Sequence, residues 1–381
     1  IISEATLYKD KDSTSSILKK IEFGIPFYII EKSTFIENKR HYYWYKVLSI
    51  DEKISGWIFS TEFRESQHNV IGTEKNDFSG LYYDVAIKSL YSDFNTAEKL
   101  FHLILEKYSE HRITFLDGFE DQLYTKKGKI LALRGLGYLY KEKKKYPKSI
   151  DHFQLLIEET KDSDEILRAK YEILKLYKDD LKYPEKTIEL CHDIINNHPN
   201  EQISGFEYNF WPDIESAMII YQTYLSEDNF DALSNECQKI IAHSSNPPVV
   251  LIAKSGLIAA YIHSDKIELA KKELLEAINT YPEEIRYFFK SPYNYSFCPI
   301  SSALSTMIDY QKEYSKAIKL AKWIRSNTQQ KELVNFINFK IGQLLDDGPG
   351  DKKDILLAFE TVDDLYTYDP LIKDWISPSE Y

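Results

Sequence analysis

The stretch from residue 130 to residue 160 contains the pattern around which the chain is organised. Hydrophobic residues recur in it at intervals of three and four, the spacing of one helix face, on both sides of a polar turn that ends at Pro147. The first face consists of Leu133, Leu136, Gly137 and Tyr140, and the second of Ser149, Phe153 and Leu156. Small residues at 137 and 149 would let two backbones cross closely between the larger side chains. The pattern therefore predicts a helical hairpin.

The same signature recurs from residue 80 onward, as a mostly small residue followed by apolar residues four and seven positions later. The sets are Ala97/Phe101/Ile104, Ser149/Phe153/Leu156, Thr187/Cys191/Ile194, Leu233/Cys237/Ile240, Ala270/Leu274/Ala277, Ala317/Ala321/Ile324 and Ile355/Phe359/Val362. Ser149, Leu233 and Ala317 are each 84 residues apart, so the chain contains a double repeat of two hairpins plus an insertion. We expect insertions at about 111–129, 201–212 and 283–299, and no strands of consequence after residue 80.

This alternation of large and small positions resembles the tetratricopeptide repeat, a helix–turn–helix unit of about 34 residues. The fifth set is the clearest, because Tyr261 lies nine residues before Ala270 and Pro282 lies twelve after it, as in that family. The resemblance implies a mainly α fold, in which residues 80–381 form a right-handed α-solenoid of about seven hairpins. It also implies an interaction scaffold that binds a protein or peptide.

Residues 1–63 have a different pattern, in which runs of apolar, aromatic and β-branched residues are separated by turn signals. Leu7 and Tyr8, the segment from Trp44 to Val47, and Gly56 followed by Trp57 and Ile58 match the pattern of the bacterial SH3 domain. The resemblance implies a small β-barrel that serves as an accessory module or binds cell-wall peptides. We expect the polar residues 64–79 to link this barrel to the helical repeats.

Composition limits the classes of function. The net charge of −12 argues against a general nucleic-acid binder, and no apolar run is long enough for a transmembrane helix. The three cysteines share no CxxC spacing, the nine histidines show no metal-ligand spacing, and motifs for nucleophilic or phosphate-binding sites are missing. We therefore predict a protein that is not an enzyme, with no catalytic residues, metal or cofactor.

Aromatic residues in the expected insertions are the candidate partner-binding residues. They are Tyr208, Phe210, Trp211, Tyr293 and Tyr295, and Tyr43 and Tyr45 of the N-terminal domain join them. Tyrosine and tryptophan dominate interface hot spots, so these rings could form a contact stripe. The alternative is that they lock the insertions onto the helices. For Trp44 and Trp57 the alternatives are a groove position and a place in the core.

Three functions remain open at this point, and the third of them is a subunit or regulator of an enzyme whose catalytic partner is another chain. The first is a scaffold in which the solenoid grips a partner and the barrel adds a second contact. The second is an envelope protein whose barrel binds peptidoglycan while the solenoid serves as a rigid arm. The resemblance of residues 1–63 and the first residue, Ile1 rather than methionine, favour a cell-envelope location after removal of a signal peptide, with the cytoplasm as the alternative.

Overall fold

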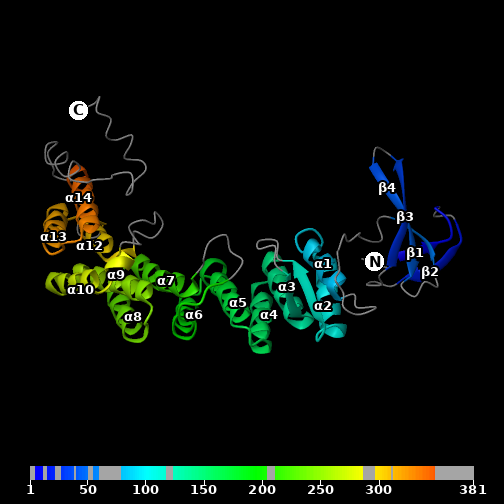
Figure 1. Ribbon diagram of the computed structural model, residues 1–381, viewed down its shortest axis with the longest axis horizontal. Coiled ribbons are helices and arrows are strands. Elements are labelled where there is room, and N and C mark those ends of the chain that lie inside the picture. The colour runs from blue at the N-terminus through cyan, green and yellow to red at the C-terminus, as the bar shows by residue number, and fades with distance from the viewer. Residues whose placement is uncertain are drawn as a thin grey trace, which may run out of the picture. The chain divides into compact units, whose positions relative to one another are not determined.

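The computed structural model describes residues 5–11, 15–21, 27–37, 40–49, 55–59, 79–116, 123–203, 211–285, 297–309 and 312–347. By their contacts, the residues form two compact units. The first comprises residues 1–182 and 203–209, and the second comprises residues 183–202 and 210–381. The fold is mainly α, with helices in tandem hairpins preceded in the sequence by an antiparallel sheet (Figure 1).

The N-terminal sheet has the strand order β2-β1-β5-β4-β3, and every pairing in it is antiparallel. Its strands are β1 (Ala5–Tyr8), β2 (Ile17–Ile21), β3 (Phe27–Glu37), β4 (Arg40–Ser49) and β5 (Ser55–Phe59). Trp44 and Trp57 are buried, which places them in the core. Gly56 is required by the approach of β1, because a Cβ atom there would lie 2.7 Å from the Leu7 side chain and 2.8 Å from the Tyr8 carbonyl oxygen.

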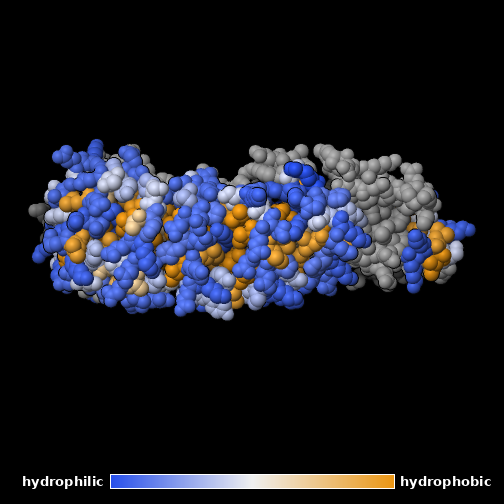
Figure 2. Space-filling view, turned by 90° about the horizontal axis from the view of Figure 1, so that it is seen from below, coloured by the Kyte–Doolittle hydropathy of each residue, from blue (hydrophilic) through white to orange (hydrophobic). Residues whose placement is uncertain are grey.

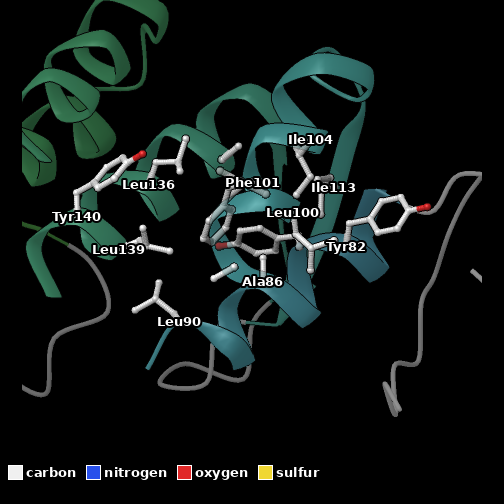
Figure 3. Close-up of a cluster of buried hydrophobic side chains, with 14 residues drawn as sticks. Tyr82, Ala86, Leu90, Leu100, Phe101, Ile104, Ile113, Leu136, Leu139 and Tyr140 are labelled. Atoms are coloured by element: carbon white, nitrogen blue, oxygen red, sulfur yellow. The ribbon is translucent and has the colours of Figure 1, made fainter. Parts of the chain in front are cut away.

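The helices of the first unit are α1 (Ser79–Ser89), α2 (Phe94–Lys107), α3 (Gly128–Glu142), α4 (Tyr146–Glu159) and α5 (Ser163–Lys175), which continues into a π-helical segment, Leu176–Leu181. Asp93 and Asp162 begin α2 and α5 by accepting backbone N–H hydrogen bonds, as aspartate favours at a helix start. Phe101 of α2 lies in a buried cluster with Leu136 and Leu139 of α3 (Figure 3). This apolar contact joins the first hairpin to the second.

The first insertion is a β-hairpin, so the expectation of no strands after residue 80 is wrong. Its strands, β6 (Arg112–Leu116) and β7 (Leu123–Lys127), pair antiparallel. Ile113 is buried, whereas its neighbour Arg112 is exposed, as expected where successive strand residues point to opposite faces. Alternation of this kind can be read in the sequence of residues 112–116. The repeat spacing, however, only marks residues 111–129 as an insertion and does not predict the structure within it.

The second unit contains α6 (Pro184–Asn197), α7 (Pro212–Ser226), α8 (Phe230–His243), α9 (Pro247–His263), α10 (Ile267–Thr280), α12 (Pro299–Asp309), α13 (Tyr314–Ser326) and α14 (Lys331–Asp346). Four of these helices begin with proline, whose fixed φ and missing N–H suit the first helical turn. Helix α9 packs against α7, α8, α10 and α12. It is accordingly buried on nearly all sides from Val249 to Ile262, which explains its almost uninterrupted apolar sequence.

The small and large positions that define the repeat lie in the core wherever the structure describes them. Ala97, Ser149, Leu233, Ala270 and Ala317 open the sets on the second helices of the hairpins and are fully buried. In the best-defined hairpin the Ser149 hydroxyl donates a hydrogen bond to the carbonyl oxygen of residue 137, at 2.7 Å. The crossing of α3 and α4 at Gly137 is thus confirmed. The seventh set, from residue 355 to 362, lies outside the described residues.

Candidate functional site

A groove of about 680 Å³ lies on the surface of the second unit, where α6 and α8 face each other beside the end of α7. Its walls and floor are formed by Pro184, Glu185, Ile188, Glu189, His192, Asn196, Tyr224, Glu227, Glu236, Lys239, Ile240 and His243. Hydrophobic patches interrupt the hydrophilic surface on the face of the helices drawn in Figure 2. Because the groove combines apolar and charged side chains in a concave surface, it has the general composition of a binding site.

Helical spacing explains why one side of α6 lines this groove. Residues 185, 188, 189, 192 and 196 follow intervals of three and four, so their side chains share a face. Thr187, Cys191 and Ile194 lie on the buried side of the same helix. On α8 the set Glu236, Lys239, Ile240 and His243 has the same spacing. The repeat pattern that buries one face of each helix therefore leaves the opposite face for the charged rim of the groove, while Ile240, a buried repeat position, lies at its floor.

Glu236 holds the two sides of the groove together. Its Oε2 atom lies 2.6 Å from His192 Nε2 of α6, and its Oε1 atom lies 2.7 Å from Lys239 Nζ of α8. Burial raises the pKa of Glu236, but the hydrogen bonds from Lys239 and His192 outweigh it and hold the pKa below its ordinary value. An ionised carboxylate only accepts hydrogen bonds, so His192 carries its proton on Nε2.

The other cationic or basic groups of the groove are also engaged. His243 Nδ1 lies 2.8 Å from the Lys239 carbonyl oxygen, which only accepts, so the ring donates from Nδ1. Lys239 is the only lysine or arginine in the lining, against four glutamates. With neutral histidines the lining has a net charge of −3.

Three of the four glutamates have no ion-pair partner among the residues that the structure describes. These are Glu185 and Glu189 on α6 and Glu227 at the end of α7, all exposed. Glu185 lies in the first turn of α6, where a negative charge interacts favourably with the helix dipole. Glu189 follows it by four residues, and like charges at that spacing repel each other. The groove thus carries negative charge that the surrounding described residues do not neutralise.

The floor of the groove is less polar than its rim. Ile240 is buried, and Ile188 and Tyr224 are half-buried. Burial and the neighbouring Glu236 raise the pKa of Tyr224, so its hydroxyl stays protonated at neutral pH. An aliphatic chain lying on this floor would contact apolar carbon while its end reached the carboxylates above.

Of the partner-binding residues predicted from the sequence, the structure describes only Tyr43, Tyr45 and Trp211. Tyr208, Phe210, Tyr293 and Tyr295 lie outside the described residues, and Tyr43 lies in β4. Trp211 is half-buried and immediately precedes Pro212, the first residue of α7. Tyr45 is only 5% exposed, so its ring contributes to the interior of the sheet and offers little contact surface.

The ends of the second and third insertions are fixed to the helices. The Asp213 carboxylate, which is fully buried, accepts hydrogen bonds from the Asn246 side chain at 2.6 Å and from the Asn200 backbone N–H at 2.9 Å. At the end of the third insertion the Phe297 ring meets Tyr221 edge-on at 5.5 Å, and its carbonyl oxygen accepts a hydrogen bond from Ser255. These contacts fix the positions of residues 200, 213 and 297, while most of the aromatic residues of the two insertions lie outside the described residues.

The groove residues were missed in the sequence because they come from three helices. Glu236 and Glu189 are 47 positions apart, and an exposed glutamate on a helix is ordinarily a solvated residue. A signal was available in the pair at 185 and 189, because two like charges on one face of an otherwise regular helix oppose helix stability. Pairing α6 with α8, however, requires the tertiary structure.

Metal ligands and cysteine thiols are the side chains to consider for chemistry other than binding. No group of three histidine, cysteine, aspartate or glutamate side chains there is placed to hold a metal ion. Cys191, Cys237 and Cys298 are buried, and burial raises the pKa of the Cys237 thiol, which keeps it protonated and unreactive. These cysteines act as small apolar core residues, as expected from the positions of Cys191 and Cys237 in the repeat.

Comparisons with known proteins add little to this picture. No family model matches the chain, and no curated protein matches it. Among solved structures, the apo form of RapI is similar at 11% sequence identity and a TM-score of 0.31, over 78% of this chain and 99% of that chain. A similarity of this degree supports no inference about function.

Proposed function

We propose that this protein is a non-enzymatic interaction protein whose helical repeats bind a segment of a partner protein in the groove between α6 and α8. The observation that carries the proposal is the groove, in which an apolar floor and unneutralised carboxylates occur together. Helical hairpins stacked in tandem hold such surfaces in fixed positions, because each helix is set by its buried face. A volume of about 680 Å³ accommodates a few side chains of a bound segment.

The groove is a better candidate for a binding surface than the apolar residues of α9. Helix α9 is enclosed by four neighbours, so its apolar residues are already buried. The groove, in contrast, leaves Ile188 and Tyr224 half-exposed beside a polar rim. An interface with an apolar centre and a polar rim is the usual anatomy of protein–protein contacts.

The test is a selection from a library of random displayed peptides with the full chain as bait. A groove-blocked variant, Ile188→Trp with Asn196→Trp, places two indole rings in the groove without changing its charge. The matched control, His102→Trp with Gln154→Trp, adds the same rings at exposed positions on α2 and α4. We expect the wild-type and control proteins to enrich the same peptides and the blocked variant to lose them. Equal enrichment by all three, or no enrichment by the wild-type protein, would refute the proposal.

A second candidate is cell-wall binding by residues 1–63, as the bacterial SH3 resemblance implies. It is supported by the antiparallel sheet found there and by the cation–π contact of Lys11 with Trp57, in which Nζ lies 4.7 Å from the ring centre. Purified peptidoglycan sacculi should retain the full chain, and should fail to retain a Lys11→Glu variant. Retention of neither protein would remove this function, while equal retention of both would place the contact elsewhere.

The location of the protein in the cell depends on which of these two proposed functions is correct. Helices of the described residues are too short or too polar to cross a membrane. We propose the cell envelope, because the cell-wall interpretation requires it, with the cytoplasm as the alternative. The domain division proposed from the sequence, with residues 1–63, 64–79 and 80–381 as barrel, linker and repeats, accompanies this proposal.

A further inference from the structure

We infer that the segment bound in the groove between α6 and α8 is basic, and that it places an arginine or lysine side chain between the carboxylates of Glu185, Glu189 and Glu227. This inference rests on the proposed function and adds the chemistry of the partner. The occupant is a stretch of a partner protein in which cationic and apolar residues are neighbours.

The charge of the groove carries the first step. Glu236 is already neutralised, because it accepts hydrogen bonds from His192 and Lys239. The carboxylates of Glu185, Glu189 and Glu227 have no ion-pair partner among the described residues. Negative charge at the rim attracts cationic ligands and repels phosphate and acidic peptides. A nucleic acid or an acidic segment is therefore a poor occupant.

The division between rim and floor carries the second step. Arginine and lysine have a long aliphatic stem and a charged end, so they pack the stem on apolar surface while the end stays polar. Ile188, Ile240 and Tyr224 form such a surface, with the carboxylates beside it. A guanidinium group also stacks favourably on an aromatic face such as that of Tyr224. A simple inorganic cation would bind the carboxylates but would not contact the apolar floor of the groove.

The third step rests on the hydrogen bond between His192 and Glu236. This bond joins α6 to α8, with 2.6 Å between His192 Nε2 and Glu236 Oε2. Neither His192 nor Lys239 is therefore free to pair with the remaining carboxylates of the lining. Lys239 is held by the other oxygen of the same carboxylate, at 2.7 Å. The unneutralised carboxylates thus stay available to a ligand instead of pairing within the groove.

Fluorescence anisotropy with two labelled probes tests the inference. One probe is a nonapeptide of alternating arginine and leucine, and the other has glutamate in place of arginine. The variant Glu185→Gln with Glu189→Gln removes two rim charges. The control Glu106→Gln with Asp151→Asn removes two exposed charges on α2 and α4, so the net charge of the chain changes equally. We expect the basic probe to bind the wild-type and control proteins alike and to bind the rim variant about tenfold more weakly, as the loss of two ion pairs implies.

Three outcomes overturn the inference. Equal weakening by the rim variant and the control would mean that the basic probe responds only to the overall charge of the chain. Equal binding of the acidic and basic probes would remove the charge argument. Loss of peptide enrichment in the groove-blocked variant, without arginine or lysine among the enriched peptides, would retain the proposed function and refute the inference. If blocking leaves enrichment unchanged, the proposed function itself fails.

Discussion

Gly137→Ala is the sharpest test of how the helical hairpins pack. A Cβ atom at residue 137 would lie 2.6, 2.7 and 2.9 Å from three carbon atoms of the Phe153 ring, well inside normal contact distance. Phe153 is 1% exposed, so its ring cannot move into solvent. The hairpin must therefore shift or the ring must leave its rotamer.

The expected magnitude combines two opposed effects. Overpacking a tight contact costs about 1–3 kcal/mol, while exchanging glycine for alanine inside a helix stabilises it by about 1 kcal/mol. Because three ring atoms are affected at once, we expect a net loss of about 1–2 kcal/mol in the free energy of unfolding. For a folded unit of the size of the first unit, this loss of unfolding free energy corresponds to a fall of about 2–8 °C in melting temperature.

A double-mutant cycle with Phe153→Leu isolates the contact. Phe153→Leu alone destabilises the hairpin by leaving space, but in its presence the new methyl group at residue 137 has room. We expect the loss of unfolding free energy in the double variant to be about 1 kcal/mol smaller than the sum of the losses in the two single variants, as for residues in direct contact. Circular dichroism during thermal and urea unfolding supplies the measurement. Stabilisation by Gly137→Ala alone, as at an open helical site, would refute this packing.

Three further predictions concern the second unit. Ala270→Leu should lower its stability by about 1–3 kcal/mol, because residue 270 is fully buried; an unchanged melting temperature would contradict the repeat register. Asp213→Ala should cost about 2–3 kcal/mol, because it leaves the Asn246 amide without its buried acceptor, and a change under 0.5 kcal/mol would show that the carboxylate does not fix the insertion. Since the pKa of Glu236 is lower in the folded state, its contribution to stability is present above its ordinary value of 4.5 and is lost as the pH falls through the folded pKa. Urea unfolding of Glu236→Gln should therefore show a deficit of about 1 kcal/mol at pH 7 that shrinks as the pH falls below 4.5 and through the folded pKa, and a deficit independent of pH would exclude the ion pair.

The helical repeats could be predicted from the sequence because their information is local. Each second helix needs one small position and two apolar positions at fixed spacing, and this spacing is set by 3.6 residues per turn whatever the neighbours are. The buried state of Ala97, Ala270 and Ala317 follows from the same rule. The strands of the N-terminal region were predicted for an equivalent reason, since runs of β-branched and aromatic residues between turn residues are also a local signal.

The hairpin at β6 and β7 shows where repeat arithmetic alone is insufficient. A repeat period locates an insertion but carries no information about the structure within it. The pairing of Ile113 with Lys126, and the burial of Ile113, depend on contacts between segments that are distant along the chain. Alternation within five-residue strands is also a weak signal beside an 84-residue period.

The sequence by itself determined which face of each helix is buried and that the protein is a chain of helical hairpins. Only the tertiary structure decided which exposed faces meet. Glu185 and Glu189 are separated from Glu227 and Glu236 by a helix and a loop, and their common groove exists because α6 and α8 face each other. Burial constrains a residue through local periodicity, whereas a surface site depends on side chains brought together from separate helices by packing, which leaves no comparable trace in the order of residues.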